Sequence, residues 1–110
     1  MQTPIQITFK NMAASEAVEA RIRERAADLE RFFDRITGCR VVVEMPHRSG
    51  HHGNVFQVRV DLTVPGEEIV VMRDAARNHA HEDVYVAIRD AFDAARRQLQ
   101  DHVRRAAAGG

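Results

Sequence analysis

Two strand-like segments joined by a two-residue turn occupy the middle of the chain. Apolar and polar residues alternate from Phe56 to Val64, the period of a strand with one buried face. Pro65-Gly66 follows, and this pair suits a type II turn because proline fixes the first central φ and glycine tolerates a positive second φ. The segment from Glu68 to Arg73 completes a predicted antiparallel hairpin.

Two more strands and a helix are predicted before this hairpin. Residues 5–9 alternate between apolar and polar, and residues 39–45 are rich in β-branched side chains. Between them, a helix is predicted from Glu16 to Thr37, with Ser15 as its N-cap and Gly38 as its left-handed C-terminal residue. Its apolar stripe recurs every three or four residues, at Val18, Ile22, Ala26, Leu29, Phe33 and Ile36.

The second predicted helix starts near Val84 and carries apolar residues at helical spacing as far as Val103. Acidic residues Glu82 and Asp83 in its first turn, and Arg104 and Arg105 in its last, would complement the helix dipole. The tail from residue 106 is expected to fray. The order β-α-β-β-β-α predicts an α+β fold in which two amphipathic helices cover one face of a four-stranded sheet, as in double-stranded-RNA-binding domains.

Length and composition narrow the function. A chain of 110 residues fits one domain, with an ordered core expected over about residues 3–105. The charge balances, 16 basic against 16 acidic residues, so the whole molecule lacks the positive field of a general nucleic-acid binder. No membrane-length apolar run or leader pattern is visible, which predicts a soluble cytoplasmic protein without membrane contact.

The sequence also lacks strong catalytic motifs. It has no glycine-rich phosphate loop, nucleophile elbow or paired cysteines, so we expect neither an enzyme nor a cofactor or small-molecule substrate. The lone Cys39 predicts a small buried hydrophobe.

Histidines gather in two predicted loops at the same end of the sheet. They are His47, His51 and His52 before the hairpin, and His79 and His81 after it. Such a cluster could hold a metal, or gain positive charge as the pH falls through about 6.5. Because the spacing matches no recognisable ligand set, we expect no metal, and solvated loop histidines remain the simpler interpretation.

Arginines follow helical spacing on both helices. Arg97 and Arg104 are seven residues apart with Asp101 between them, and Arg89 and Arg96 repeat this spacing beside them. On the first helix, Arg21 and Arg25 lie one turn apart, with Arg31 further along. Arginines one turn apart can straddle successive phosphates. Charge alone favours a different interpretation, a solvent face of salt bridges with nearby acids at Glu24, Asp28, Glu30, Asp90, Asp93 and Asp101.

Two motifs resemble the family of ribosome hibernation promoting factors and ribosome-associated inhibitor A. One is His81-Glu82-Asp83-Val84-Tyr85-Val86-Ala87-Ile88, continued by Arg97-Gln98-Leu99, and the other is Leu29-Glu30-Arg31-Phe32-Phe33-Asp34-Arg35-Ile36. The resemblance covers about residues 5 to 105. It implies a cytoplasmic factor that binds the rRNA of the small ribosomal subunit in the channel for mRNA and tRNA, and so blocks translation in stationary phase or stress.

The resemblance implies that Arg25, Arg31 and Arg97 face RNA and that Tyr85 is the aromatic residue of the signature, although this ring could instead pack at the helix–sheet edge. Together with Arg21 and Arg104 they form the predicted RNA-binding set. Three departures, at Asp28, Ala94 and Asp101, fall where the family commonly has lysine, and predict that this chain binds ribosomes more weakly or in a different way. Longer family members append a domain that pairs ribosomes, so we do not expect this chain to pair ribosomes unaided.

Two other interpretations stay open at this point. Zero net charge and the two reversed charges fit a diverged module on the same fold that binds a protein or another RNA. The loop histidines fit a metal- or pH-responsive domain.

Overall fold

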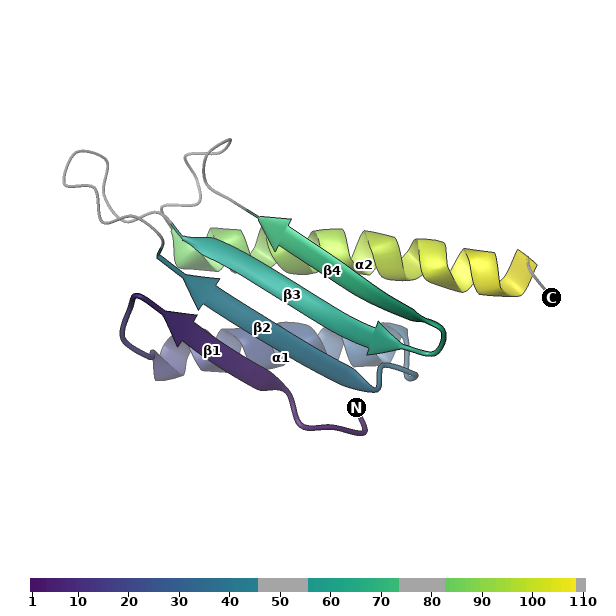
Figure 1. Cartoon of the computed structure of the whole chain (residues 1–110), viewed down its shortest axis with the longest axis horizontal. Helices are drawn as coiled ribbons and strands as arrows, with labels where there is room; N and C mark the ends of the chain where they lie inside the picture. The colour runs from purple at the N-terminus through teal and green to yellow at the C-terminus, as the bar shows by residue number, and fades with distance from the viewer. Residues whose placement is uncertain (46–55, 74–82, 109–110) are drawn as a thin grey trace.

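The structure is a computed structural model that describes residues 1–45, 56–73 and 83–108. Its four-stranded sheet has the order β1-β2-β3-β4, and both helices cover the same face (Figure 1). Strands β1 and β2 are parallel, whereas β2, β3 and β4 are antiparallel to their neighbours. The predicted α+β class is confirmed. The elements are β1 Gln6–Lys10, α1 Glu16–Phe32, β2 Gly38–Glu44, β3 Gln57–Val64, β4 Glu67–Arg73 and α2 Val84–Ala108.

The central hairpin forms as the alternation predicts. Gly66 has φ 83°, the value that the second central residue of a type II turn requires. Strand β4 starts one residue earlier than expected, because Glu67 pairs with Val64 directly across the turn. The register therefore places every second side chain of both strands on the helix side of the sheet.

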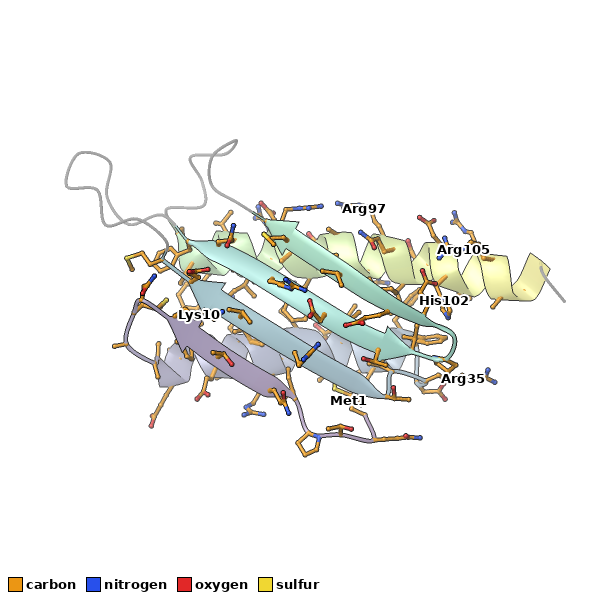
Figure 2. All side chains as sticks on the ribbon, in the orientation of Figure 1. Met1, Lys10, Arg35, Arg97, His102 and Arg105 are labelled. Atoms are coloured by element: carbon orange, nitrogen blue, oxygen red, sulfur yellow. The ribbon has the colours of Figure 1, made fainter. Side chains whose placement is uncertain are left out.

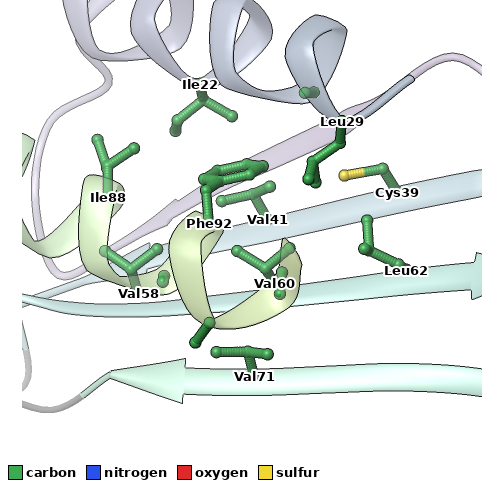
Figure 3. Packing of buried hydrophobic residues seen from close by; sticks show 14 of the residues in the cluster. Ile22, Leu29, Cys39, Val41, Val58, Val60, Leu62, Val71, Ile88 and Phe92 are labelled. Atoms are coloured by element: carbon green, nitrogen blue, oxygen red, sulfur yellow. The ribbon is translucent and has the colours of Figure 1, made fainter. Parts of the chain in front are cut away.

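The core lies between the sheet and the two helices. Figure 3 shows Phe92 of α2 between Ile22 of α1 and the strand residues Val41 and Val60, and all four side chains are buried. Cys39 belongs to the same cluster, as predicted, with 3% of its surface exposed. Burial raises the pKa of its thiol to about 12, and the carboxylates of Asp61 and Glu30 add to this shift.

Helix α1 ends at Phe32, five residues before the predicted end. Phe33 is extended, with φ −147° and ψ 108°, and its N–H donates to the Leu29 carbonyl at 2.8 Å. The apolar period continues to Ile36 because residue 36 is buried in the core outside any helix. Gly38 is therefore not a left-handed helix terminus but the first residue of β2.

Both ends of α2 also differ from the prediction. Asp83 is not in the first turn but before it, where its carboxylate accepts the Tyr85 N–H at 2.9 Å and its carbonyl accepts the Ala87 N–H at 3.1 Å. Its predicted companion Glu82 lies outside the described residues. The helix continues through Ala108, past the expected fraying point, so the last turn holds Arg105 and Arg104 precedes it. Among the described helices, none is long and apolar enough to cross a membrane.

Candidate nucleic-acid interface

Helices α1 and α2 run in the same direction across the sheet and contact each other along one line (Figure 1). Four residues of each helix lie along this line. They are spaced four, three and four positions apart in the sequence, which keeps them on one side of their helix. We call this line the α1–α2 seam. Its residues are Arg21, Arg25, Asp28 and Phe32 of α1, and Tyr85, Arg89, Phe92 and Arg96 of α2.

Two cation–π contacts join the helices at the two ends of the seam. The Arg21 guanidinium of α1 lies 5.1 Å from the ring centre of Tyr85 on α2. Three turns later the roles are exchanged, and the Arg96 guanidinium of α2 lies 4.8 Å from the ring centre of Phe32 on α1. Each such contact contributes about 0.5–1 kcal/mol at an exposed site. The pairs therefore hold both helices, and the arginines that they carry, in a fixed relation.

The seam carries more positive than negative charge. Four of its eight residues are arginines and one, Asp28, is acidic. Asp28 pairs with Arg31 at 3.4 Å, outside the stripe. Arg21 is 3.5 Å from Glu24, and Arg89 is 3.1 Å from Asp90.

The remaining two seam arginines are Arg25 and Arg96. Within residues 1–45, 56–73 and 83–108, neither Arg25 nor Arg96 forms an ion pair. The burial of Phe92 gives the seam an apolar floor beneath these charges. The seam can thus offer guanidinium donors to phosphates beside an apolar surface.

The structure brings half of the predicted RNA-binding set together. Arg21, Arg25 and Tyr85 meet at the seam. Arg97 lies at the edge of α2 away from α1 (Figure 2).

Arg31 and Arg104, the other two members of that set, lie off the seam stripes. The Arg31 side chain is 80% exposed and pairs with Asp28 at 3.4 Å, and Arg104 is 3.9 Å from Asp101. These two follow the salt-bridge interpretation of the arginine rows, whereas Arg25 does not.

Sequence reasoning missed Phe32 and gave no role at the seam to Arg96. The signal was present, because both helices repeat the same four-three-four spacing of arginines and aromatic rings. The spacing points to a shared site only once the structure shows that the stripe of α1 faces the stripe of α2.

The three departures from the family pattern have different surroundings. Asp28 and Asp101 are exposed and sit next to arginines. Ala94 is only 2% exposed and packs in the core. The weaker binding expected from the three departures stays a prediction.

The histidine cluster cannot be placed. His47, His51, His52, His79 and His81 all lie outside the described residues. Within the part of the chain that the structure describes, no group of three histidine, cysteine or acidic residues could hold a metal ion.

His102, which the sequence reasoning passed over, forms a separate cluster at the far end of α2 (Figure 2). Its Nδ1 is 2.6 Å from Oε1 of Glu67, and Arg105 Nη2 donates to both oxygens of that carboxylate at 2.9 Å. The bonds from His102 and then from Arg105 lower the pKa of Glu67. The His102 ring also meets Phe33 edge to face, with centres 5.9 Å apart. This cluster ties the hairpin turn and the end of α1 to α2.

The sheet face opposite the helices also carries arginines, but here acids neutralise them. Asp61, which is 7% exposed, accepts from Arg59 Nε at 2.9 Å and from Arg40 Nη2 at 3.5 Å. Arg40 also lies 3.6 Å from Glu68. Lys10 and Thr8 line a shallow hollow beside this cluster.

Comparison with known proteins identifies the family to which the chain belongs. Residues 5–107 match the family described as sigma 54 modulation protein / S30EA ribosomal protein. A ribosome hibernation promotion factor of Deinococcus radiodurans is 33% identical over 96 residues, which are 86% of this chain and 46% of that protein. The chain thus spans less than half of that relative's length.

A ribosome hibernation promoting factor of Pseudomonas putida is 28% identical over 98 residues, covering 89% of this chain and 84% of that protein. Among solved structures, a ribosomal subunit interface protein from Coxiella burnetii has the same fold, with a TM-score of 0.71 and 15% identity over 91% of this chain and 97% of that one. Because the family match covers nearly the whole chain and the two sequence motifs point the same way, this protein belongs to the sigma 54 modulation protein / S30EA ribosomal protein family, which includes the hibernation promoting factors.

Proposed function

We propose that this protein is a ribosome hibernation factor that binds rRNA of the small subunit in the channel for mRNA and tRNA and blocks translation under stress. The observation that carries the proposal is the α1–α2 seam, where Arg25 and Arg96 make no ion pair within the described ranges. The names of its relatives support the association with ribosomes. Its place of action would be the cytoplasm.

The proposed mechanism is occupancy. Guanidinium groups bind phosphates through charge-assisted hydrogen bonds and release the counterions that surround the RNA. This release favours binding and does not require an excess of positive charge on the whole protein. The rigid α+β body then fills space that tRNA or mRNA would take. Net neutrality limits long-range attraction, so binding depends on the local charge of the seam.

Co-sedimentation tests the proposal. The protein is mixed with purified small subunits, large subunits or neither, and is followed through sucrose gradients at several salt concentrations. We expect it to travel with the small subunit at low salt, and the logarithm of the binding constant to fall by about 0.7–0.9 per phosphate contact for each tenfold rise in salt. Inhibition of translation in vitro should follow the same salt dependence.

The negative result is equally clear. A protein that is folded by circular dichroism but stays at the top of the gradient at low salt would overturn ribosome binding. Equal binding to both subunits would overturn the proposed site on the small one.

A further inference from the structure

We infer that the α1–α2 seam binds a short run of unpaired RNA, with nucleobases stacked on Phe32 and Tyr85 and phosphates held by the arginines between them. This inference rests on the proposed function and names the class of RNA that the seam takes. A surface that binds only the phosphates of duplex RNA would need the arginines but not the aromatic rings of Phe32 and Tyr85.

Two of the three large exposed apolar residues on the described helices lie on the seam, and the third lies beyond its end. Phe32, Tyr85 and Val103 are each 37% exposed, and Val103 lies seven residues after Arg96, two turns further along the same side of α2. The other large exposed hydrophobic residues in the described part of the chain, Val70 and Met72, lie on β4, on the sheet face that the helices leave open. The seam therefore combines solvent-facing rings with arginines, the combination that single-strand binding surfaces use.

Each ring already contacts a guanidinium group. The Arg21 guanidinium lies over Tyr85 and the Arg96 guanidinium lies over Phe32. Unpaired bases stack on aromatic rings and on guanidinium planes alike. A base can therefore add to either end of the seam without breaking the pair beneath it.

The distance between the two ring–arginine pairs suits a few nucleotides. Eleven residues separate Arg21 from Phe32, and eleven separate Tyr85 from Arg96, so the pairs are about 16 Å apart along the helix axes. Arg25 stands between them on α1, where its charge faces no described carboxylate within ion-pair distance. It is placed to hold a phosphate of a strand whose bases stack at both ends.

A duplex cannot use these rings in the same way. Paired bases stack on one another, and an A-form helix presents mainly phosphates and 2′-hydroxyl groups to a protein surface. The exposed rings therefore favour a single strand, and because every base has a π-face, they favour it with little sequence preference.

Fluorescence anisotropy with two probes tests the inference. One probe is a labelled ten-residue oligouridylate, and the other is a labelled RNA hairpin with a ten-base-pair stem, both at the same ionic strength. We expect the oligouridylate to bind at least about fivefold more tightly, and Phe32→Leu or Tyr85→Leu to weaken it by about fivefold or more. The same variants should change hairpin binding less than twofold.

Two matched variants guard against a purely structural effect. Tyr85→Phe keeps the ring, so it should bind oligouridylate as the wild type does. Met72→Leu changes an exposed apolar residue on the opposite sheet face and should change neither probe. Thermal unfolding of every variant verifies the fold.

The outcomes separate this inference from the proposed function. Hairpin binding equal to or tighter than oligouridylate binding, no oligouridylate binding at all, or unchanged binding by both leucine variants would overturn the inference. If the wild type still co-sediments with small subunits in that case, ribosome binding stands without base stacking. If co-sedimentation also fails, the proposed function falls with it.

Discussion

The seam and the open sheet face both carry arginines, yet their charges are arranged in opposite ways. On the sheet, Arg40 stands opposite Asp61 in the β2–β3 register, and Arg59 lies two residues from Asp61 on the same face. The nearly buried Asp61 carboxylate thus pairs with both guanidinium groups, and Glu68 supplies a second negative charge beside Arg40. At the seam, Asp28 pairs along its own helix with Arg31 and leaves Arg25 without a described acidic partner.

This contrast shows that the number of arginines on a surface does not by itself decide how much of their charge is left without an acidic partner. Strand register places opposite charges across from each other, where they bind each other rather than a ligand. Helical spacing of three or four residues pairs acids with arginines along one helix, so the side that faces the other helix keeps part of its charge. We therefore propose that the seam binds RNA and that the arginines of the sheet have a structural role.

The largest expected effect comes from the floor of the seam. Phe92→Ala should lower the free energy of unfolding by about 3–5 kcal/mol, because it leaves a cavity between α2, α1 and the sheet. Met72→Ala, at a 45% exposed position on the other face, should change it by less than about 0.5 kcal/mol. Urea unfolding measures both, and similar losses would mean that the seam has no deeper support than the open face.

A smaller loss is expected at the centre of the open face. Asp61→Asn should cost about 1.5–3 kcal/mol, since it removes the negative charge from two nearly buried hydrogen bonds and replaces one of the two acceptor oxygens by an N–H donor. Glu68→Gln removes an exposed partner of Arg40 and should cost less than about 0.5 kcal/mol. Equal unfolding midpoints for these two variants would contradict the structural role of Asp61.

The cluster at Glu67 makes stability depend on acidity. Its hydrogen bonds to His102 and Arg105 lower the pKa of the folded-state carboxylate below its ordinary value of 4.5. Between the folded and the unfolded pKa of Glu67, the unfolded state binds more protons than the folded state. The contribution of the carboxylate to stability is therefore present above the unfolded pKa and is lost as the pH falls through the folded pKa. The stability difference between wild type and Glu67→Gln should therefore shrink as the pH falls below the ordinary carboxyl pKa of 4.5.

Arg105→Gln supplies the control, because it removes one of the two groups that hold the Glu67 carboxylate. Its own dependence on pH should lie between those of wild type and Glu67→Gln. A stability difference between wild type and Glu67→Gln that stays constant as the pH falls below 4.5 would show that the cluster does not favour the ionised carboxylate.

The smallest effect is expected on the side of α2 away from α1. Asp101→Lys removes the weak partner of Arg104 and adds a positive charge near Arg97. We expect binding to small subunits to tighten by about threefold at low salt, with a modest change in salt dependence. Filter binding would measure this affinity. If Asp101→Lys raised the affinity by a larger factor than neutralising the seam arginines lowered it, the main RNA contact would lie on this side of α2 and not at the seam.

The fold could be predicted from local patterns, but the ends of its helices could not. The alternation from Phe56 to Val64 and the Pro65-Gly66 turn both produced the expected hairpin. The spacing that extended α1 to residue 37 was misleading, because Phe33 and Ile36 remain apolar in order to pack outside the helix. A buried residue is apolar whether its backbone is extended or helical, so the apolar pattern alone does not show where the helix ends.

The site was less predictable than the fold. Helical spacing identified Arg21 and Arg25, but no local pattern shows that Phe32 of one helix receives Arg96 of the other. The same holds for His102, whose partner Glu67 lies 35 residues away across the sheet. Contacts between distant elements depend on how the helices pack on the sheet. The spacing of residues along one sequence does not predict that packing.

The most direct test compares two charges removed from each surface. Small-subunit binding is measured against salt concentration for Arg25→Gln/Arg96→Gln at the seam and for Lys10→Gln/Arg40→Gln on the open sheet face. We predict that the seam variant loses at least about tenfold in affinity and that the slope of log K against log salt becomes shallower by about 1.4–1.8, while the open-face variant stays within about twofold. An equal or larger loss for the open-face variant would contradict the assignment of RNA binding to the seam.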